Sequence, residues 1–181
     1  ISRMASILMF PTSRITPLFS QRAVTTIRLN SLKMDTKKIK NILLKKGYEL
    51  EEIDIVKDAY FVLNKDKSEI SQTEEYFEGL YYIQNLSSML PAVLLDPQEE
   101  DSVLDMCAAP GSKTTHIAAI MNNKGSIVAN DSDSPRISSL KSVLNQFGVK
   151  NTKVTMSDGS QFGKNYPAKF DRVLLDAPCS G

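Results

Sequence analysis

The chain has 181 residues, of which 41% are hydrophobic and 24% charged, and its formal net charge at pH 7 is +1. This composition excludes a disordered or collagen-like chain, and the lack of any run of about 18 apolar residues excludes a membrane-spanning helix. Two cysteines and a single histidine exclude a disulfide framework and a histidine-rich metal site, so we expect reduced thiols, an intracellular compartment and no metal.

The small net charge conceals a basic N-terminal segment. Residues 1–34 contain five bases and no acid, whereas the remainder of the chain contains 17 bases and 21 acids. We interpret residues 1–23, which show no clean periodicity, as a basic extension. An acid-free start of this kind is typical of a mitochondrial presequence, of an arm that binds phosphates, or of upstream sequence read through in frame, and these alternatives stay open.

Residues 24–96 predict a small α+β unit followed by a helical linker. A β-branched strand over 24–30 precedes a helix over 37–46, which Asp35 or Thr36 can cap and Gly47 ends. Two further strands are expected over 50–55 and 59–63. Apolar residues recur every three or four positions over 74–95, which predicts a helical region with a break or a new start at Pro91, and the turn at 96–98 is a plausible domain boundary.

Residues 97–181 alternate between strand and helix patterns. This alternation predicts an α/β fold with a parallel, doubly wound sheet, in which ligands bind at the carboxyl ends of the strands. The chemically informative residues should therefore follow directly after each strand. The expected strands are 102–106, 126–130, 152–156 and 170–176, and the expected helices are 113–121 and 135–147.

The first such motif is the segment 105–115, DMCAAPGSKTT, which follows a Val-Leu strand and opens a helix. Small residues allow a ligand to approach the backbone, and a helix N-terminus offers free N–H groups. A P-loop is excluded because Cys107 and Ser112 stand where its glycines belong, and a dinucleotide fingerprint is excluded because Gly111 stands alone. A tight strand-to-helix turn without a ligand stays the structural alternative.

Acidic residues end the next two strands. Asp131 comes about 20 residues after the loop, where a carboxylate can accept both hydroxyls of a ribose, although it could also cap the following helix. Asp158 could accept an adenine amine, or it could belong to an ordinary Asp-Gly turn.

The last strand leads into DAPCSG, which places Asp176 and Cys179 at the same edge of the sheet. The alternatives are a strand-end turn for Asp176 and a half-buried small side chain for Cys179.

Taken together, DMCAAPGSKTTHIA, IVAND and FDRVLLDAPCSG resemble the RNA cytosine-5 methyltransferase family over roughly residues 24–181. The resemblance implies a Rossmann-like S-adenosylmethionine-dependent methyltransferase sheet, incomplete at its C-terminal part, preceded by a small α+β RNA-recognition subdomain. The implied domains are 24–96 and 97–181. The implied cofactor is S-adenosylmethionine, and the residues implied to bind it are Cys107, Ala108, Ala109, Pro110, Gly111, Ser112, Lys113, Asp131, Arg136, Asp158 and Asp176.

The resemblance also implies a reaction. A thiolate adds to carbon 6 of cytosine, which makes carbon 5 nucleophilic toward the methyl group, and an acid near N3 stabilises the developing charge. Asp176 would serve the N3 side, and Cys179 would match the cysteine that assists release of the methylated RNA. The usual nucleophile is a second cysteine on a later strand, which these 181 residues do not contain. We therefore expect no methyl transfer by this chain as given.

RNA is the expected partner, with rRNA favoured over tRNA by the wording of IVAND and FDRVLLDAPCSG. The predicted RNA contacts are Arg28, Asn30 and Lys33. The alternatives are a non-catalytic RNA-binding protein on the same fold, and a methyltransferase for exocyclic amines, although the aromatic residue that stacks on the base in such enzymes is missing after Asp176. The rRNA branch implies the nucleus or nucleolus, with mitochondria or cytoplasm as alternatives.

Overall fold

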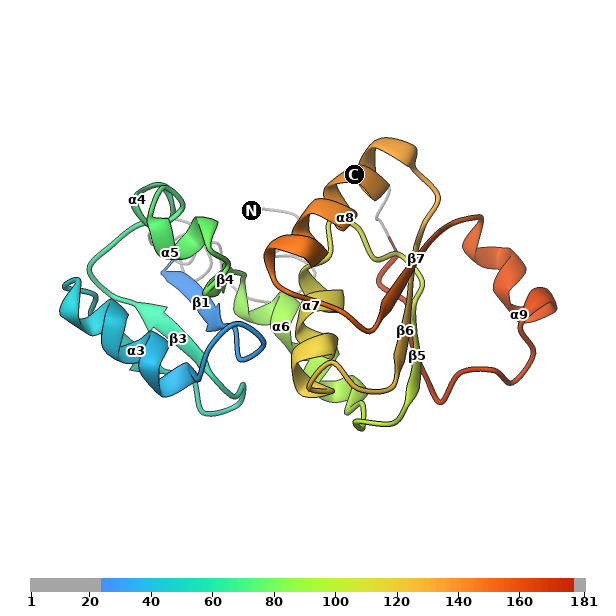
Figure 1. Ribbon diagram of the computed structural model, residues 1–181, viewed down its shortest axis with the longest axis horizontal. Helices are drawn as coiled ribbons and strands as arrows, with labels where there is room; N and C mark the ends of the chain where they lie inside the picture. Colours follow the sequence, from blue (N-terminus) through green and yellow to red (C-terminus); the bar gives the residue numbers. More distant parts are fainter. Residues whose placement is uncertain (1–23, 178–181) are drawn as a thin grey trace, which may run out of the picture.

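Two four-stranded sheets with their own helices make up residues 24–177, which are the part of the chain described by this computed structural model, the side chain of Asn165 excepted. The sheets belong to two lobes that lie side by side along the long axis, with helix α6 (Leu86–Leu95) between them (Figure 1). The predictions that residues 1–23 form an extension and that Cys179 lies at the binding edge of the sheet concern positions outside the described residues.

The N-terminal lobe is an antiparallel sheet in the order β2-β3-β1-β4. Helix α3 (Thr36–Lys45) begins at Asp35, whose carboxylate accepts a hydrogen bond from the Lys38 amide, and this confirms one of the two predicted caps. The strands are β1 (Thr25–Leu29), β2 (Leu50–Glu52), β3 (Ala59–Val62) and β4 (Tyr81–Ile83), and the short helices are α4 (Lys67–Ile70) and α5 (Glu74–Phe77).

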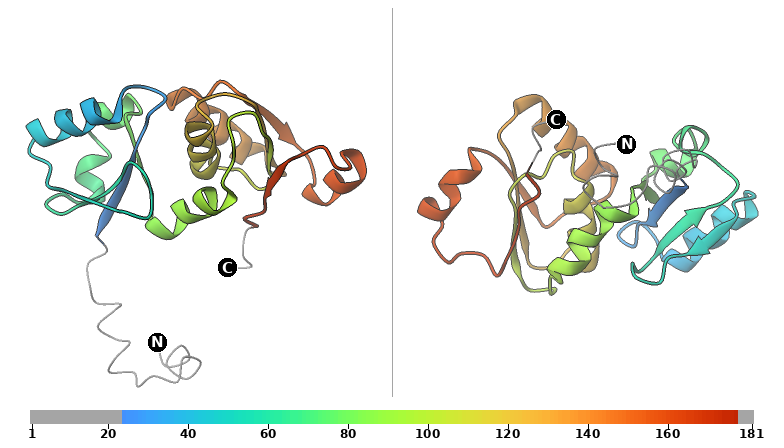
Figure 2. Two further views of the ribbon diagram at one scale, coloured as in Figure 1. Left: turned by 90° about the horizontal axis from the view of Figure 1, so that it is seen from below. Right: turned by 180° about the vertical axis from the view of Figure 1, so that it is seen from behind.

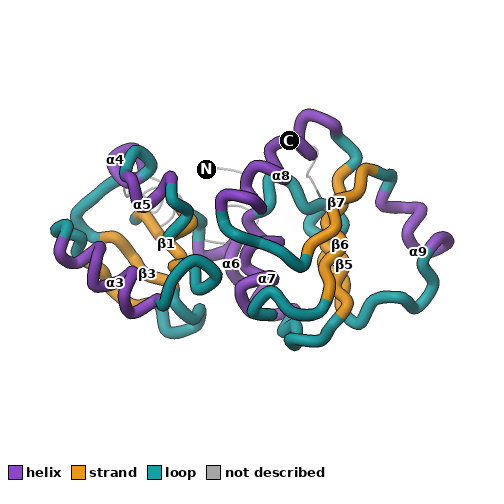
Figure 3. Tube along the Cα trace, viewed as in Figure 1, coloured by secondary structure: helices purple, strands orange, loops and turns teal. Residues whose placement is uncertain are grey.

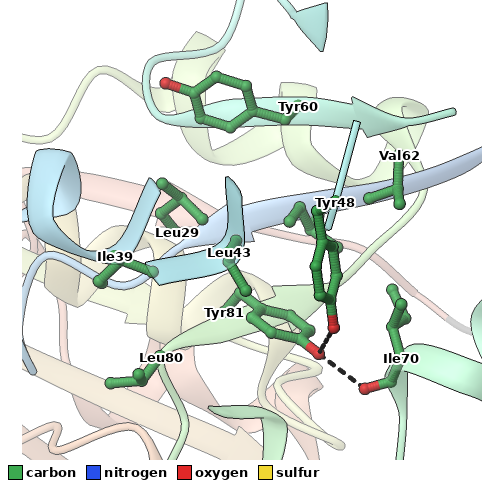
Figure 4. Packing of buried hydrophobic residues seen from close by; sticks show 10 residues of the cluster. Leu29, Ile39, Leu43, Tyr48, Tyr60, Val62, Ile70, Leu80 and Tyr81 are labelled. Carbon is green, nitrogen blue, oxygen red and sulfur yellow. Dashed lines mark hydrogen bonds between the residues drawn. The ribbon is translucent and has the colours of Figure 1, made fainter. Parts of the chain in front are cut away.

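Helix α3 packs its apolar stripe against the N-terminal sheet. Ile39 and Leu43 meet Leu29 and Val62 in one buried cluster (Figure 4). The ring of Tyr81 is buried in the same core. Its hydroxyl group is also hydrogen-bonded, because the O–H donates to the Ile70 carbonyl at 2.7 Å and lies 3.3 Å from the Tyr48 hydroxyl. Burial raises the pKa of Tyr81, so the hydroxyl stays protonated.

The C-terminal lobe is a parallel sheet in the order β7-β6-β5-β8, as the alternating pattern predicted. The chain runs outward from β5 (Ser102–Asp105) through β6 (Ser126–Asp131) to β7 (Thr152–Met156). It then returns to the other side of β5 as β8 (Arg172–Leu174). The strand order therefore reverses beside β5, and such a reversal is where open α/β sheets bind ligands.

Helices cover the two faces of the parallel sheet unequally. Helices α7 (Ser112–Ile120) and α8 (Ser134–Gln146) lie on the face turned toward the N-terminal lobe, whereas α9 (Phe162–Asn165) lies on the far face (Figures 2 and 3). A 3-10 turn, η1 (Gly159–Gln161), precedes α9.

Helix α6 contacts both lobes. Its Ala92 belongs to the buried cluster of the C-terminal lobe, and its Met89 packs on Ile53 and Val56 of the N-terminal lobe. The predicted division at 96/97 stays a prediction.

Two expectations about elements are wrong. The region 74–95 is not helical throughout, because the chain turns at Gly79 and residues 81–83 pair with β1 as strand β4. Pro91 does not break helix α6, because the carbonyl deprived of its donor belongs to the exposed Ser87 and can be solvated. The strands predicted over 50–55 and 170–176 are shorter than expected, and α4, η1 and α9 were not foreseen.

Candidate functional site

The loop 107–111 joins the end of β5 to the start of α7 at the point where the strand order reverses. The Ala109–Pro110 bond is cis, and Gly111 has a φ of +109° as it opens the helix. A Cβ at Gly111 would lie 3.0 Å from Leu140 Cδ1 on α8, so the loop packs closely on that helix and only glycine fits. The first turn of α7 begins directly after it and carries Ser112 and Lys113.

Asp131, at the end of β6, accepts a hydrogen bond from the backbone of this loop. Its Oδ2 accepts a hydrogen bond from the Ala109 amide at 3.2 Å and lies 3.4 Å from Arg136 Nη2, and its Oδ1 accepts from the Asp133 amide. Arg136 also donates to the Ala109 carbonyl at 2.8 Å. Asp131 is only 2% exposed, so a ligand would reach its carboxylate by displacing the half-exposed Arg136.

The neighbouring Asn130 is a site residue that the sequence analysis missed. Its side-chain amide donates to the carbonyls of Met106 and Ser157, and its Oδ1 accepts from the amide and hydroxyl of Ser157 and from Thr155. Its backbone carbonyl accepts from the Ala108 amide at 2.7 Å. One buried side chain thus joins the segments that follow β5 and β7, and the only signal in the sequence was an Asn directly before the acid.

Two further pairs hold the first turn of α7. Lys113 Nζ lies 2.5 Å from Asp176 Oδ2, which joins the helix to the segment after β8. Thr114 donates its hydroxyl to Asp105 Oδ2 at 2.7 Å. Asp105 is 1% exposed, and burial raises the pKa of its carboxyl to about 6, while the Thr114 hydrogen bond opposes the rise.

Asp158 lies at the same edge but is exposed to solvent. It accepts a hydrogen bond from the Ser160 amide at 2.9 Å, and that bond lowers the pKa of its carboxyl. The next residue, Gly159, lies against Met106, since a Cβ there would come within 3.0 Å of Met106 Cγ. The structure therefore brings loop 107–113 and the acids at 131, 158 and 176 to one edge.

Cys107 is a poor candidate for a nucleophile. Burial raises the pKa of its thiol, and the nearby carboxylates of Asp131 and Asp105 raise it further. An attacking thiolate needs the opposite environment. Cys179 lies outside the described residues.

The prediction that Arg28 and Asn30 contact RNA stays a prediction, although this structure buries both side chains. Both are 2% exposed, because Arg28 in β1 and Asn30 directly after that strand face the C-terminal lobe rather than solvent. Asn30 donates to the carbonyls of Gly79 and Phe147, and Arg28 reaches Thr115 on α7. Lys33 is exposed, with its side chain near Gly148, and stays a predicted RNA contact.

No group of three or more potential metal ligands occurs within residues 24–177, and no helix in that part of the chain is long and apolar enough to cross a membrane.

Two sequence models of known families match the chain, and the gap between them lies inside α6, the helix between the lobes. A sequence model of the 16S rRNA methyltransferase RsmB/F matches residues 92–181, and a model of the N-terminal domain of 16S rRNA methyltransferase RsmF matches residues 1–86. Together the two models leave only residues 87–91 unmatched.

Curated relatives carry consistent names. A 28S rRNA (cytosine-C(5))-methyltransferase of Mus musculus is 40% identical over 176 residues, which are 96% of this chain and 22% of that protein. A ribosomal RNA small subunit methyltransferase F of Pectobacterium carotovorum is 42% identical over 160 residues, which are 86% of this chain and 33% of that protein. The chain thus spans between about a fifth and a third of these relatives' length.

A solved structure supports the same fold. The methyltransferase homolog protein from Pyrococcus horikoshii superposes with a TM-score of 0.83 at 37% identity, over 93% of this chain and 54% of that one.

Proposed function

We propose that this chain, which belongs to the RNA cytosine-5 methyltransferase family, binds S-adenosylmethionine at the edge built from loop 107–113 and contributes that site to the methylation of rRNA at carbon 5 of cytosine. The observation that carries the proposal is the 2.5 Å pair between Lys113 and Asp176. It joins loop 107–113, the cofactor loop, to Asp176 in the motif FDRVLLDAPCSG (170–181), at the reversal of strand order.

The side chains at this edge fit the cofactor chemically. Its sulfonium is positive, and the acids Asp131, Asp158 and Asp176 provide a field of the opposite sign. Its methionine carboxylate suits the free N–H groups at the start of α7 and the ammonium of Lys113. When bound, the cofactor supplies an electrophilic methyl group.

Asp131 would accept the ribose hydroxyls and Asp158 the adenine amine. For Asp131 this role requires the carboxylate to exchange its contact with Arg136 for the two hydroxyls. Loop residues Ala108, Ala109 and Pro110 would line the cofactor, because their small or closed side chains leave the backbone accessible.

The target base would lie on the Asp176 side. Asp176 is half exposed, with its side chain 51% accessible, so N3 of a cytosine that has been extruded from its stack can reach its carboxyl group. A thiolate must add to carbon 6 and leave again after the carbon 5 proton has been removed. We propose that neither Cys107, whose thiol pKa is raised, nor Cys179 is that thiolate.

This assignment of the cysteines has a direct test. The 181-residue chain should bind the cofactor but incorporate no radiolabelled methyl into total RNA. If it does turn over, and Cys179→Ser abolishes the turnover, then Cys179 is the nucleophile.

We propose rRNA as the substrate because relatives from both bacteria and animals are rRNA methyltransferases by name. If the substrate is rRNA of the large subunit, we propose that the protein acts in the nucleolus. The alternative locations are mitochondria and the cytoplasm. Bisulfite sequencing of RNA from cells lacking the complete protein should show one cytosine that has lost its methyl group in rRNA. A loss confined to tRNA would select the alternative substrate, and no loss in either would favour a non-catalytic RNA-binding protein.

Cofactor binding is tested by calorimetry with S-adenosylhomocysteine. The purified protein should give a saturable heat, and Asp176→Asn and Lys113→Met should each weaken binding. Lys124→Met is the matched control, because Lys124 pairs with Glu99 at 2.7 Å on the opposite edge of the lobe. Absence of heat from the unmodified, folded protein would contradict the proposal.

A further inference from the structure

Arg28 belongs to β1 of the N-terminal lobe, but its guanidinium lies against the first turn of α7 in the C-terminal lobe. Its Nη2 donates to Thr115 Oγ1 at 3.1 Å and to the Ser112 carbonyl at 3.5 Å. Its Nε donates to Gln84 Oε1 at 3.4 Å. Thr115 in turn donates its hydroxyl to the Ser112 carbonyl at 2.9 Å, so the guanidinium completes a small network around Ser112, the first residue of α7.

The guanidinium of Arg28 is buried, and it has no carboxylate as an ion-pair partner within the described residues. The residue is 2% exposed. Burial lowers the pKa of Arg28 to about 10, which still leaves the group charged at neutral pH. Burying a charge is costly unless its donors are satisfied, and here the acceptors belong to α7 and to Gln84, with the Tyr82 ring 5.9 Å away.

The satisfaction of this buried charge therefore depends on how the two lobes are docked. If α7 moves away from β1, the guanidinium loses its acceptors from Ser112 and Thr115 together. Conversely, the docked lobe fixes those two residues, and Lys113 lies between them in the sequence.

The first turn of α7 is then held from three directions. Asp105 of β5 holds Thr114, Asp176 after β8 holds Lys113, and Arg28 holds Ser112 and Thr115. Two of these supports come from the lobe that contains the site, and the third comes from the other lobe.

We propose that Arg28 is a positioning residue through which the N-terminal lobe sets the geometry of the cofactor loop, so that docking of the lobes and binding of S-adenosylmethionine are energetically coupled. This inference rests on the proposed function. Coupling of this kind is reciprocal, so bound cofactor also tightens the docking of the lobe that would contact RNA.

The test compares three variants by calorimetry with S-adenosylhomocysteine, using the complete protein. Arg28→Met removes the charge and the hydrogen bonds but keeps a long side chain, and Arg28→Lys keeps the charge without the fork of donors. The matched control is Gln146→Met, because Gln146 Nε2 donates across the same lobe interface to the Tyr76 carbonyl at 2.9 Å without touching the cofactor loop.

We expect Arg28→Met to raise the dissociation constant about tenfold and Arg28→Lys to give an intermediate value, within the usual range of coupling between sites. Gln146→Met should stay within about twofold of the unmodified protein, because a weaker interface alone does not disturb α7. Wild-type affinity in Arg28→Met, or an equal loss in Gln146→Met, would overturn the proposal.

Hydrogen exchange separates this proposal from the proposed function. In the ligand-free protein, Arg28→Met and Arg28→Lys should speed exchange at the amides of residues 113–117 while leaving those of α8 unchanged. Unchanged exchange at 113–117 contradicts the positioning role even if the cofactor is bound. Absence of heat from the unmodified protein contradicts the proposed function and leaves the exchange result valid.

Discussion

At the scale of single residues, Asn130 forms more side-chain hydrogen bonds at this edge of the sheet than any of the predicted cofactor-binding residues within residues 24–177. It is 1% exposed, and its side chain forms hydrogen bonds with Met106, Thr155 and Ser157. An Ala at this position leaves buried donors and acceptors of two separate segments unpaired. Each unpaired buried group costs about 1 to 3 kcal/mol, so the segments after β5 and β7 should lose their relative placement.

We expect Asn130→Ala to lower the free energy of unfolding by about 3 kcal/mol and to weaken cofactor binding. Urea denaturation measures the first effect. The control is Asn151→Ala, since Asn151 Nδ2 donates only to the Lys124 carbonyl at the other end of the sheet. Equal losses in the two variants would show that Asn130 is an ordinary structural asparagine.

Asp105 makes stability depend on pH. The pKa of its carboxyl is about 6 in the folded protein against 3.8 for the unperturbed group, so the folded state binds more protons between these values. The stability that this carboxyl contributes is therefore fully present below about pH 4 and is lost as the pH rises through about 6.

Asp105→Asn removes this titration and keeps an acceptor for Thr114. The free energy of unfolding of the wild type, relative to that of the variant, should fall by about 2 to 3 kcal/mol between about pH 4 and pH 7. Chemical denaturation across that range measures it. If the free energy of unfolding depends on pH in the same way in both proteins, Asp105 is not the group responsible.

At the scale of elements, the glycine in the turn between α5 and β4 allows the two lobes to approach each other closely. Gly79 has a φ of +73°, and a Cβ there would lie 2.5 Å from the Gln146 carbonyl oxygen at the end of α8. Gly47, which ends α3, has nearly the same φ of +77° but no atom within 4 Å of its Cβ position. The two positions differ in what surrounds them rather than in backbone conformation.

Gly47→Ala should therefore cost about 1 kcal/mol, the strain of a positive φ alone. Gly79→Ala should cost clearly more, about 3 kcal/mol, because the backbone of Gln146 cannot move away as a flexible side chain would. Thermal denaturation of the pair measures the difference. Equal destabilisation would mean that the lobes adjust to each other freely.

At the scale of the whole molecule, the two lobes should unfold together. Arg28 and Asn30 satisfy buried groups across the interface, and the Tyr82 and Phe147 rings meet there with centroids 4.8 Å apart. Calorimetry should show a single transition whose calorimetric and van't Hoff enthalpies agree.

Asn30→Ala deprives the carbonyls of Gly79 and Phe147 of their donor and should separate or broaden that transition. Asn64→Ala is the matched control, because the Asn64 side chain also bonds to backbone groups, those of Gly47 and Glu49, but both lie inside the N-terminal lobe. Two transitions in the wild type would count against cooperative docking.

The sequence by itself determined the parallel sheet, the edge that carries the site and most of the acids on it, because strand periodicity and strand-end motifs are local properties of the chain. Strand β4 could not be predicted from the sequence, because Tyr76, Leu80 and Ile83 have helical spacing. Residues 81–83 form a strand only because they pair with β1.

The roles of Arg28 and Asn30 were decided only by the tertiary structure. A cationic and an amide side chain on a short strand are suited equally to RNA phosphates and to buried carbonyl groups. Which of the two they meet depends on the docking of a second lobe, whose contacts come from Ser112, Thr115 and Phe147. Long-range burial of this kind leaves no periodic signal in the sequence, so the hydrogen bonds of these two residues across the lobe interface could not be predicted from it.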